Sequence, residues 1–356
     1  MEEKHKIVLK QKIIRNLEDY GVIWNENTHQ VTVKDFREVQ RKLAERTNSK
    51  GQEYKSKIQS YLAQPLDIDI SRIDPYLVTV ESRTEHKQLW AYATSYWSVP
   101  VTVGYGRRIR YFVFDRQNDK LIGIIGLCDP VIGLGVRDNE SIGWTKDQKM
   151  QRLYNCMTAY ILGAIPPYNK VLSSKLIALT LMFPKVRKDF YQKYKDSASV
   201  ITGKNKMPYL VYIDTLGAFG KSAIYNRLEN WDFINYTKGQ SHLHITANGS
   251  WELIRQVVPD DVFSTYKFGE GPNWKMRILK RGLRELGLSE DMLSIGWQRG
   301  YYRCPLAINW QDYLLGNTNR VVWRDFTQTS LVSYWYKRWV TPRLDTLQSN
   351  LDSELE

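Results

Sequence analysis

The residues best suited to bind a charged ligand are cations interleaved with aromatic rings late in the sequence. One group lies on an expected helix that begins at Trp274, and it comprises Lys275, Arg277, Lys280, Arg281 and Arg284. A second group is Lys337 and Arg338, inside the aromatic run YWYKRW at 334–339. Cations neutralise phosphates, and exposed rings stack on unpaired bases with about 1–3 kcal/mol per base. The pattern predicts a nucleic-acid interface; the alternative is that the rings dock on a sheet and leave Lys337 and Arg338 in water.

Two polar residues follow expected strands and form a second candidate site. Asp214 ends the strand 209–214, and Asn169 comes shortly after the buried strand 158–165. Open sheets place their ligands beyond the carboxyl ends of strands, so we expect a cleft there for a phosphate-bearing ligand. Asp214 is the candidate general base, and Asn169 either caps the next helix or binds the ligand. No conventional nuclease spacing links Asp214 with Asp129, the other carboxylate considered.

The connection that precedes residue 146 is rich in glycine and charge, yet it carries a tryptophan. Arg137 and Asp138 lie in it, followed by the tripeptide 142–144 that ends with Trp144. Such connections often form sites on a rigid scaffold. The alternative is a loop that Trp144 anchors on the core, and the sequence leaves both readings open.

The charge balance favours a polyanionic partner. The chain has 356 residues, with 51 Lys and Arg against 38 Asp and Glu, so its formal net charge is +13. Such an excess creates a field that attracts nucleic acid. The three cysteines are far apart and five histidines are scattered, which gives no zinc spacing and no disulfide framework. No stretch reaches the roughly 20 apolar residues that span a bilayer, and the first residues lack the apolar core of a signal peptide, so a cytoplasmic protein is expected.

The periodicity of apolar residues predicts an α+β protein with one mixed sheet. A hairpin of two strands, 109–115 and 120–127, is expected around the turn Asn118-Asp119. Strands are also expected at 76–80, 158–165, 209–214 and 233–237, with helices at 170–181, 186–194 and 221–229. Three domains follow: a helical module at 1–70, a sheet core at 71–240 and a basic, aromatic extension at 241–356. A third helix is expected in the first module, at 52–63.

This order of elements resembles the GCN5-related N-acetyltransferase (GNAT) fold over about residues 75–238. The segment 120–126 (KLIGIIG) is similar to the second hairpin strand of that fold, and 222–233 is similar to its late passage from helix to strand. The resemblance implies that Tyr225 protonates a leaving thiolate. It also implies that the start of the helix near 170–175 binds the pyrophosphate of acyl-CoA, with contacts from Asn169, Lys170, Ser173 and Ser174. Serine and lysine stand here where that family has glycines.

Longer strings resemble the Druantia anti-phage defence family, DruA, over about residues 1–340. They are IRYFVFD at 109–115, IGW at 142–144, YILGAIPPYNK at 160–170, TLGAFGKS at 215–222 and YNRL at 225–228. The resemblance implies membership of a multi-gene defence system with a large helicase-like companion protein. It supplies no catalytic mechanism.

Two hypotheses therefore stand. The first is a defence component that engages nucleic acid and works with partner proteins. The second is an acyltransferase that uses Tyr225 and the segment 167–175. The sequence does not decide whether any reaction is catalysed, and it assigns no cofactor to the first hypothesis.

Overall fold

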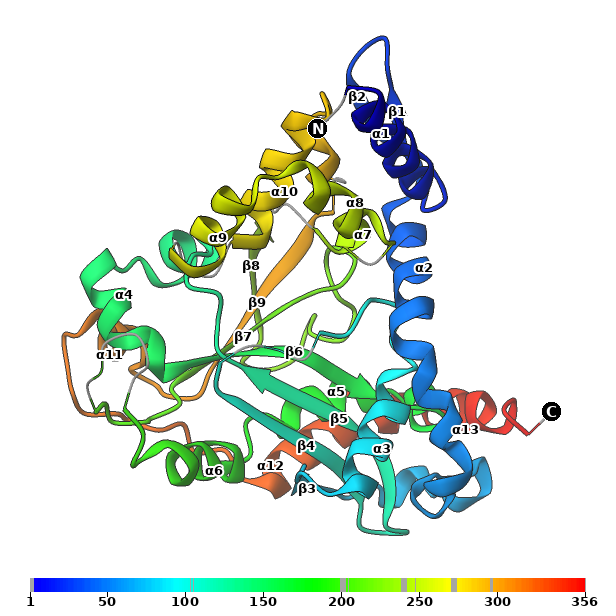
Figure 1. Cartoon of the computed structure of the whole chain (residues 1–356). Helices are drawn as coiled ribbons and strands as arrows, with labels where there is room; N and C mark the ends of the chain where they lie inside the picture. The colour runs from blue at the N-terminus through cyan, green and yellow to red at the C-terminus, as the bar shows by residue number, and fades with distance from the viewer. Residues whose placement is uncertain are drawn as a thin grey trace. The chain divides into compact units, whose positions relative to one another are not determined.

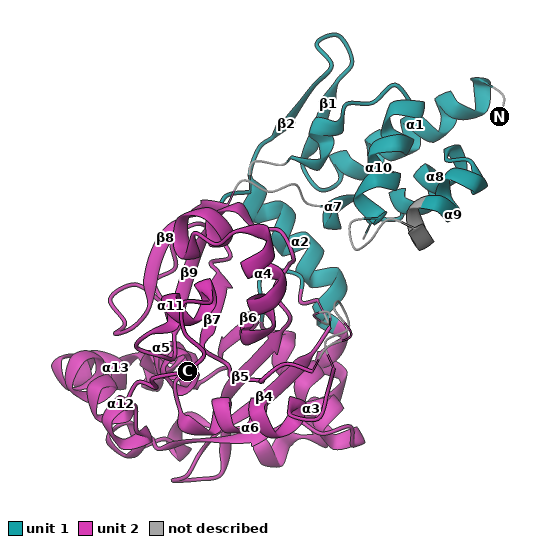
Figure 2. Ribbon diagram, turned by 90° about the vertical axis from the view of Figure 1, so that its left-hand side faces the viewer, with its two compact units in different colours: residues 1–49, 97–100, 238–298 teal, residues 50–96, 101–237, 299–356 magenta. Residues whose placement is uncertain are grey.

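The computed structural model describes residues 3–102, 104, 106–198, 203, 205–237, 242–246, 248–269, 274–294 and 297–355, except for the side chains of 266–269. The chain divides into two compact units (Figure 2). Unit 1 contains residues 1–49, 97–100 and 238–298, and unit 2 contains residues 50–96, 101–237 and 299–356. The three domains expected from the sequence stay a prediction. The compact units do not follow the expected boundary at 240, because residues 238–298 belong to the same unit as the first 49 residues.

Unit 1 is a helical unit with one small hairpin. Its first part is α1 (Glu3–Glu18), β1 (Val22–Asn25), β2 (Gln30–Val33) and α2 (Phe36–Asn48). Its second part is α7 (Leu243–Thr246), α8 (Ser250–Val257), α9 (Asp260–Gly269), α10 (Trp274–Glu285) and the 3-10 turn η8 (Glu290–Leu293). The buried face of α1, with Leu9, Ile13 and Leu17, joins Ile254 of α8 and Leu279 of α10 in one apolar cluster. The two parts, distant in sequence, therefore share a core.

A buried histidine makes unit 1 sensitive to acid. The ring of His244 is fully buried, and its Nε2 lies 2.6 Å from the carbonyl oxygen of Met292. Burial lowers the pKa of His244 from 6.5 to about 4, while the Met292 carbonyl opposes this shift. Folding therefore favours the neutral ring, and this contribution is complete above pH 6.5 and is lost as the pH falls toward 4.

We expect acidification from pH 7 to pH 4 to remove about 3 kcal/mol of stability through His244, since each pKa unit corresponds to about 1.4 kcal/mol. Urea unfolding followed by tryptophan fluorescence at several pH values measures this loss. The non-titrating variant His244→Gln should show a flatter profile over the same range. An equally steep profile in the variant would contradict the assignment.

Unit 2 is built on a seven-stranded mixed sheet, which confirms the expected fold class. The strand order is β3-β4-β5-β6-β7-β9-β8, and only β6 and β7 pair in parallel. The strands are β3 (Pro75–Thr79), β4 (Arg108–Asp115), β5 (Lys120–Cys128), β6 (Cys156–Ala164), β7 (Tyr212–Leu216), β8 (Asp232–Thr237) and β9 (Arg299–Pro305). The hairpin expected around Asn118-Asp119 is present as β4 and β5.

The helices of unit 2 lie on both sides of this sheet. They are α3 (Thr84–Thr94), α4 (Lys146–Arg152), α5 (Ser173–Thr180), α6 (Pro184–Tyr194), α11 (Trp310–Leu315), α12 (Gln328–Trp335) and α13 (Leu344–Asp352). Two short π-helices, η5 (Val136–Ile142) and η9 (Tyr336–Val340), and a 3-10 turn, η7 (Tyr168–Val171), connect them. In Figure 1, α5 and α12 lie behind the sheet. Together with α6 and α13 they cover its apolar face, where Tyr111, Ile125, Ala159, Ile213 and Tyr302 pack in one core.

Several expected elements differ from the structure. The expected helix at 52–63 is a series of 3-10 turns, η1 (Ser49–Lys57) and η2 (Gln59–Tyr61). The expected helix at 221–229 is a set of turns, in which Arg227 has a left-handed backbone (φ 64°). Lys175 explains this difference, because its Nζ donates to the carbonyl oxygens of Ala223, Ile224 and Asn226. Carbonyls turned toward an ammonium group do not form the ladder of a helix.

Candidate functional site

The two faces of the sheet differ in chemistry, and the polar one carries the candidate site. Residues that pair directly across strands share a face, and one such row crosses the sheet from β4 to β9. The row consists of Arg108, Cys128, Thr158, Asp214 and Arg303. Arg108 is exposed and Thr158 is half-buried, whereas Asp214 is only 1% exposed. The row therefore runs from a surface cation to a buried carboxylate.

Asp214 is held by hydroxyl groups from the neighbouring strands. Its Oδ1 accepts a hydrogen bond from Thr158 Oγ1, and its Oδ2 accepts one from the Tyr301 hydroxyl at 3.0 Å. The Tyr301 hydroxyl lies 2.7 Å from that of Tyr212, which lies 2.8 Å from Ser141 Oγ. A chain of four hydroxyl groups thus links η5 with β6 through the carboxyl group of Asp214.

The insertion before residue 146 folds onto this chain. Arg137 in η5 is fully buried, and its Nη2 lies 2.8 Å from Asp138 Oδ1. Asp138 also accepts hydrogen bonds from Trp144 Nε1 at 3.1 Å and from Lys149 Nζ at 3.0 Å. The Trp144 ring is buried, so it anchors the loop, and the loop buries an ion pair beneath it. The structure therefore shows the loop anchored by Trp144, and a role of this loop as a functional site stays a prediction.

The charge of Arg137 acts on the buried carboxyl of Asp214. Burial raises the pKa of the Asp214 carboxyl, and the positive charge of Arg137 acts in the opposite direction. One nitrogen of the Arg137 guanidinium, Nη1, is buried and has no hydrogen-bond partner among the described residues. The cluster thus fixes the position of the Asp214 carboxyl, and the half-buried Thr158 hydroxyl lies between it and the surface of the sheet. The carboxyl itself is sealed from solvent. The role of Asp214 as a general base stays a prediction.

Tyr225 lies on the opposite, apolar face. It is 6% exposed, and its ring stacks on Trp231 at 4.9 Å between centroids and contacts Tyr302 at 5.0 Å. Burial raises the pKa of its hydroxyl to about 12, although a hydrogen bond with Thr215 lowers it in part. The structure does not bring Tyr225 into the polar cluster, and its catalytic role stays a prediction.

The residues predicted to bind a cofactor are spread over separate contacts. Asn169 is exposed on η7, and the Nζ of Lys170 lies 2.6 Å from Glu354 Oε1. Ser174 Oγ accepts a hydrogen bond from the backbone N–H of Ala164 at 3.1 Å, and Ser173 is fully buried. Their role in binding a cofactor stays a prediction.

The expected cleft shared by Asn169 and Asp214 is wrong. Asp214 pairs with Thr158, near the start of β6, whereas Asn169 comes after the end of that strand at Ala164. At roughly 3.3 Å per residue, the strand between Thr158 and Ala164 alone spans about 20 Å. One ligand site cannot contain both side chains.

The aromatic run 334–339 packs inside unit 2. The Tyr334 hydroxyl donates to the carbonyl oxygen of Arg227 at 3.1 Å, and Trp335 Nε1 donates to that of Leu172 at 3.3 Å. Trp335 and Trp339 are 0% and 5% exposed, so neither ring is available to stack on a base. Only Lys337 and Arg338 of this run are exposed. The segment docks its aromatic side on α5 and leaves its cations in water, as the alternative reading described.

The cations of α10 in unit 1 are largely paired with acids. Lys280 and Arg284 lie 3.2 Å and 3.4 Å from Glu290, and Arg281 lies 2.6 Å from Glu285. The Nζ of Lys275 lies 5.7 Å from the centroid of the Trp274 ring. Acidic neighbours compete with phosphates for these cations, while Lys337 has no ion-pair partner among the described residues.

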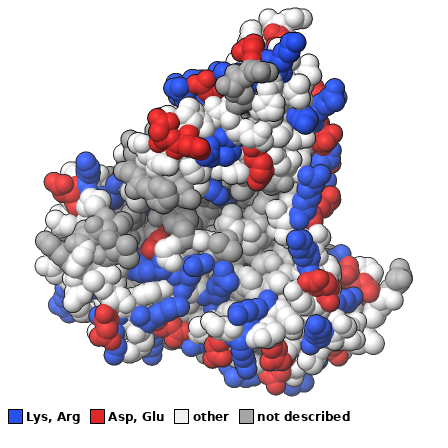
Figure 3. Space-filling model, viewed as in Figure 1, with Lys and Arg blue, Asp and Glu red and all other residues white. Residues whose placement is uncertain are grey.

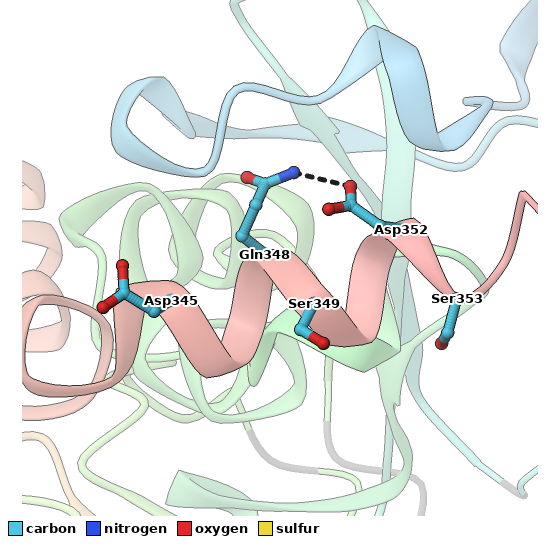
Figure 4. Close-up of a pocket in the computed structure, with 5 residues that line it drawn as sticks. All are labelled: Asp345, Gln348, Ser349, Asp352 and Ser353. Atoms are coloured by element: carbon cyan, nitrogen blue, oxygen red, sulfur yellow. Dashed lines mark hydrogen bonds between the residues drawn. The ribbon is translucent and has the colours of Figure 1, made fainter.

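A shallow pocket lies on α13 (Figure 4). Its lining residues come from that helix and from the residue that follows it: Asp345, Gln348, Ser349, Asp352 and Ser353. Gln348 Nε2 donates to Asp352 Oδ1 at 2.8 Å across the pocket. Two carboxylates on a single exposed helix do not suit a phosphate ligand. Within the described part of the chain, no group of three or more His, Cys, Asp and Glu residues could hold a metal ion.

The fold and the polar cluster define an α+β protein with a seven-stranded mixed sheet and a buried arginine–carboxylate centre. A family model, that of the Druantia protein DruA, matches residues 27–316, and the chain belongs to that family. The curated Druantia protein DruA of Escherichia coli (strain UMEA 4076-1) is 40% identical over 263 residues, which cover 71% of this chain and 64% of that protein. No solved structure matches the chain. Among the described helices, none has the length and apolar character needed to cross a membrane.

Proposed function

We propose that this protein is a component of a Druantia anti-phage defence system, that it engages nucleic acid in the cytoplasm, and that it acts with other proteins of the system, including a helicase-like partner. Membership of the DruA family supports the defence role. The related protein extends beyond the matched region, so the activity and partners of that whole protein are part of the proposal.

One observation carries the nucleic-acid role: cations are exposed on η9 without acidic partners nearby. Lys337 and Arg338 are exposed, and no ion pair joins either of them to a described residue. The net charge of +13 adds a long-range attraction for polyanions. Lys and Arg side chains also gather on the face of unit 2 shown in Figure 3. Because the neighbouring rings are buried, the contact we propose is with the phosphate backbone and not with stacked bases.

The GNAT resemblance remains part of the proposal. The order β3, α3, the β4–β5 hairpin, β6, α5, α6, β7 and β8 supports it. The acyltransferase alternative gains no specific support, since Tyr225 is buried and Lys175 is bound to backbone carbonyls.

The phosphate contact is tested with the double variant Lys337→Ala/Arg338→Ala. If both side chains neutralise phosphates of duplex DNA, the slope of log Kobs against log salt should become shallower by about 1.8. Fluorescence anisotropy with a labelled duplex between 50 and 250 mM salt measures the slope. The matched double variant Lys280→Ala/Arg281→Ala removes the same charge from residues that are paired with acids, and should change the slope less.

A wild-type protein that does not bind DNA or RNA at low salt would refute the nucleic-acid role. An unchanged slope in the Lys337/Arg338 variant would refute these residues as the contact. Co-purification of the protein with the products of the neighbouring genes tests the partner proposal, with the helicase-like protein as the expected companion.

A further inference from the structure

The indole ring of Trp339 is surrounded by an unusual number of cations. The Nζ of Lys175 lies 4.1 Å from its ring centroid, and the guanidinium carbons of Arg338 and Arg343 lie at 5.2 Å and 5.6 Å. Lys175 also donates to the carbonyl of Asn226, next to Arg227. Four positive charges thus come from α5, the turn at 222–230 and the segment after α12.

These charges are not balanced by acids. Arg227, Arg338 and Arg343 are exposed, and each is without an ion-pair partner in the described part of the chain. Burial and, to a smaller extent, the positive charges of Arg227 and Arg343 lower the pKa of Lys175 to about 8. Like charges this close repel each other in the absence of a counter-ion. An anion between them would relieve the repulsion.

Two further features point to a ligand at this place. Trp339 Nε1 is buried and has no hydrogen-bond partner among the described residues, and a buried donor without an acceptor costs about 1–3 kcal/mol. Arg227 has a left-handed backbone (φ 64°), a conformation that costs a residue with a β-carbon about 1–2 kcal/mol. The Lys175 hydrogen bonds and the Tyr334 hydroxyl hold the turn in that shape. The backbone conformation of Arg227 therefore costs free energy, and the contacts of the turn hold Arg227 next to the residue that Lys175 binds.

We propose that Arg227, Arg338 and Arg343 form a binding site for a phosphate group, with Lys175 and Trp339 as its floor. Arginine suits this role because its planar fork of N–H groups matches phosphate oxygens. The phosphate belongs either to a nucleic-acid backbone or to a free nucleotide. The first source deepens the proposed function and rests on it, whereas the site itself does not depend on that function.

Inorganic pyrophosphate is the probe for the site. We expect saturable binding by isothermal titration calorimetry at constant ionic strength, weakened at least 10-fold by Arg343→Ala or Arg227→Ala. Arg320→Ala, which removes an exposed arginine from the loop after α11, should bind as the wild type does. Absence of saturable binding, or an equal loss in the Arg320 variant, would overturn the proposal.

A second measurement places the ligand. Lysine labelled with 13C at Cε allows the titration of Lys175 to be followed by NMR, because its pKa of about 8 separates it from lysines with ordinary values near 10.5. A bound anion should raise this pKa. Pyrophosphate that binds without moving the titration of Lys175 lies elsewhere, and the proposal then fails even if every variant folds.

Competition identifies the source of the phosphate. Displacement of pyrophosphate by a 12-nucleotide single strand or a short duplex assigns the site to nucleic acid, and displacement only by ATP or ADP assigns it to a free nucleotide. Displacement by neither would overturn a biological phosphate site. If wild-type protein binds pyrophosphate but no nucleic acid, the site stands and the nucleic-acid role falls. If nucleic acid binds with the salt dependence expected for phosphate contacts but pyrophosphate does not bind, the nucleic-acid role stands and the phosphate site falls.

Discussion

Replacing Arg137 with alanine is expected to lower the free energy of unfolding by about 3 kcal/mol, because it removes one partner of a buried ion pair and empties the space of a fully buried side chain. Asp138 would keep Lys149 and Trp144 as partners. Asp214, however, would lose the positive charge that favours its ionised form. Urea unfolding of the wild type and the variant at pH 7 measures the difference.

Two controls separate the ion pair from packing. Arg72→Ala, at an exposed position, should change stability by less than about 0.5 kcal/mol. The variant Arg137→Met restores most of the lost side-chain volume without the charge, so a loss of stability equal to that of Arg137→Ala would assign the effect to the ion pair. A single variant as stable as the wild type would show that the cluster contributes little to folding.

Replacing Lys175 with methionine is expected to cost about 4 kcal/mol, since the carbonyl groups of Ala223, Ile224 and Asn226 would lose their shared donor and each such loss costs about 1–3 kcal/mol. Methionine keeps most of the unbranched apolar stem of the side chain and removes the ammonium group that lies over Trp339. The turn at 222–230 should then exchange its amide hydrogens faster, which hydrogen-exchange mass spectrometry detects peptide by peptide.

Lys170→Met is the matched control, because Lys170 is a lysine of the same region that pairs with Glu354 at the surface. Surface pairs contribute about 0–1 kcal/mol, so this variant should exchange as the wild type does at 222–230. Equal protection of that turn in the Lys175 variant would contradict the role we assign to its ammonium group.

Local patterns predicted the hairpin and the buried strand well, because both are specified by neighbouring residues. Alternating apolar residues around Asn118-Asp119 give β4 and β5, and the apolar run before Ile165 gives β6. The prediction of a helix at 221–229 was wrong for the opposite reason. Its helical pattern is overridden by Lys175, about 50 positions earlier, and no local signal reports that contact.

The candidate site was predicted in part. Asp214, Arg137 and Trp144 were each singled out from the sequence, but β9 was not, and β9 supplies Tyr301 to the carboxylate. Pairing of β7 with β9 joins residues more than 80 positions apart. The reading of Asn169 and Asp214 as neighbours failed because the two residues lie toward opposite ends of β6: Asp214 in β7 pairs with Thr158 near its start, and Asn169 in η7 follows its end.

Residues 238–298 are inserted between β8 and β9, two strands that pair directly with each other. Thr237 and Arg299, the residues on either side of it, are direct partners across the two strands, so their Cα atoms lie about 5 Å apart. A two-residue turn would join them equally well. Closing the longer connection costs only about 3 kcal/mol of chain entropy in a flexible-loop estimate. The β8–β9 pair can therefore form whatever the length of this connection, whereas the buried face of α1 depends on the residues of α8 and α10 that the connection carries.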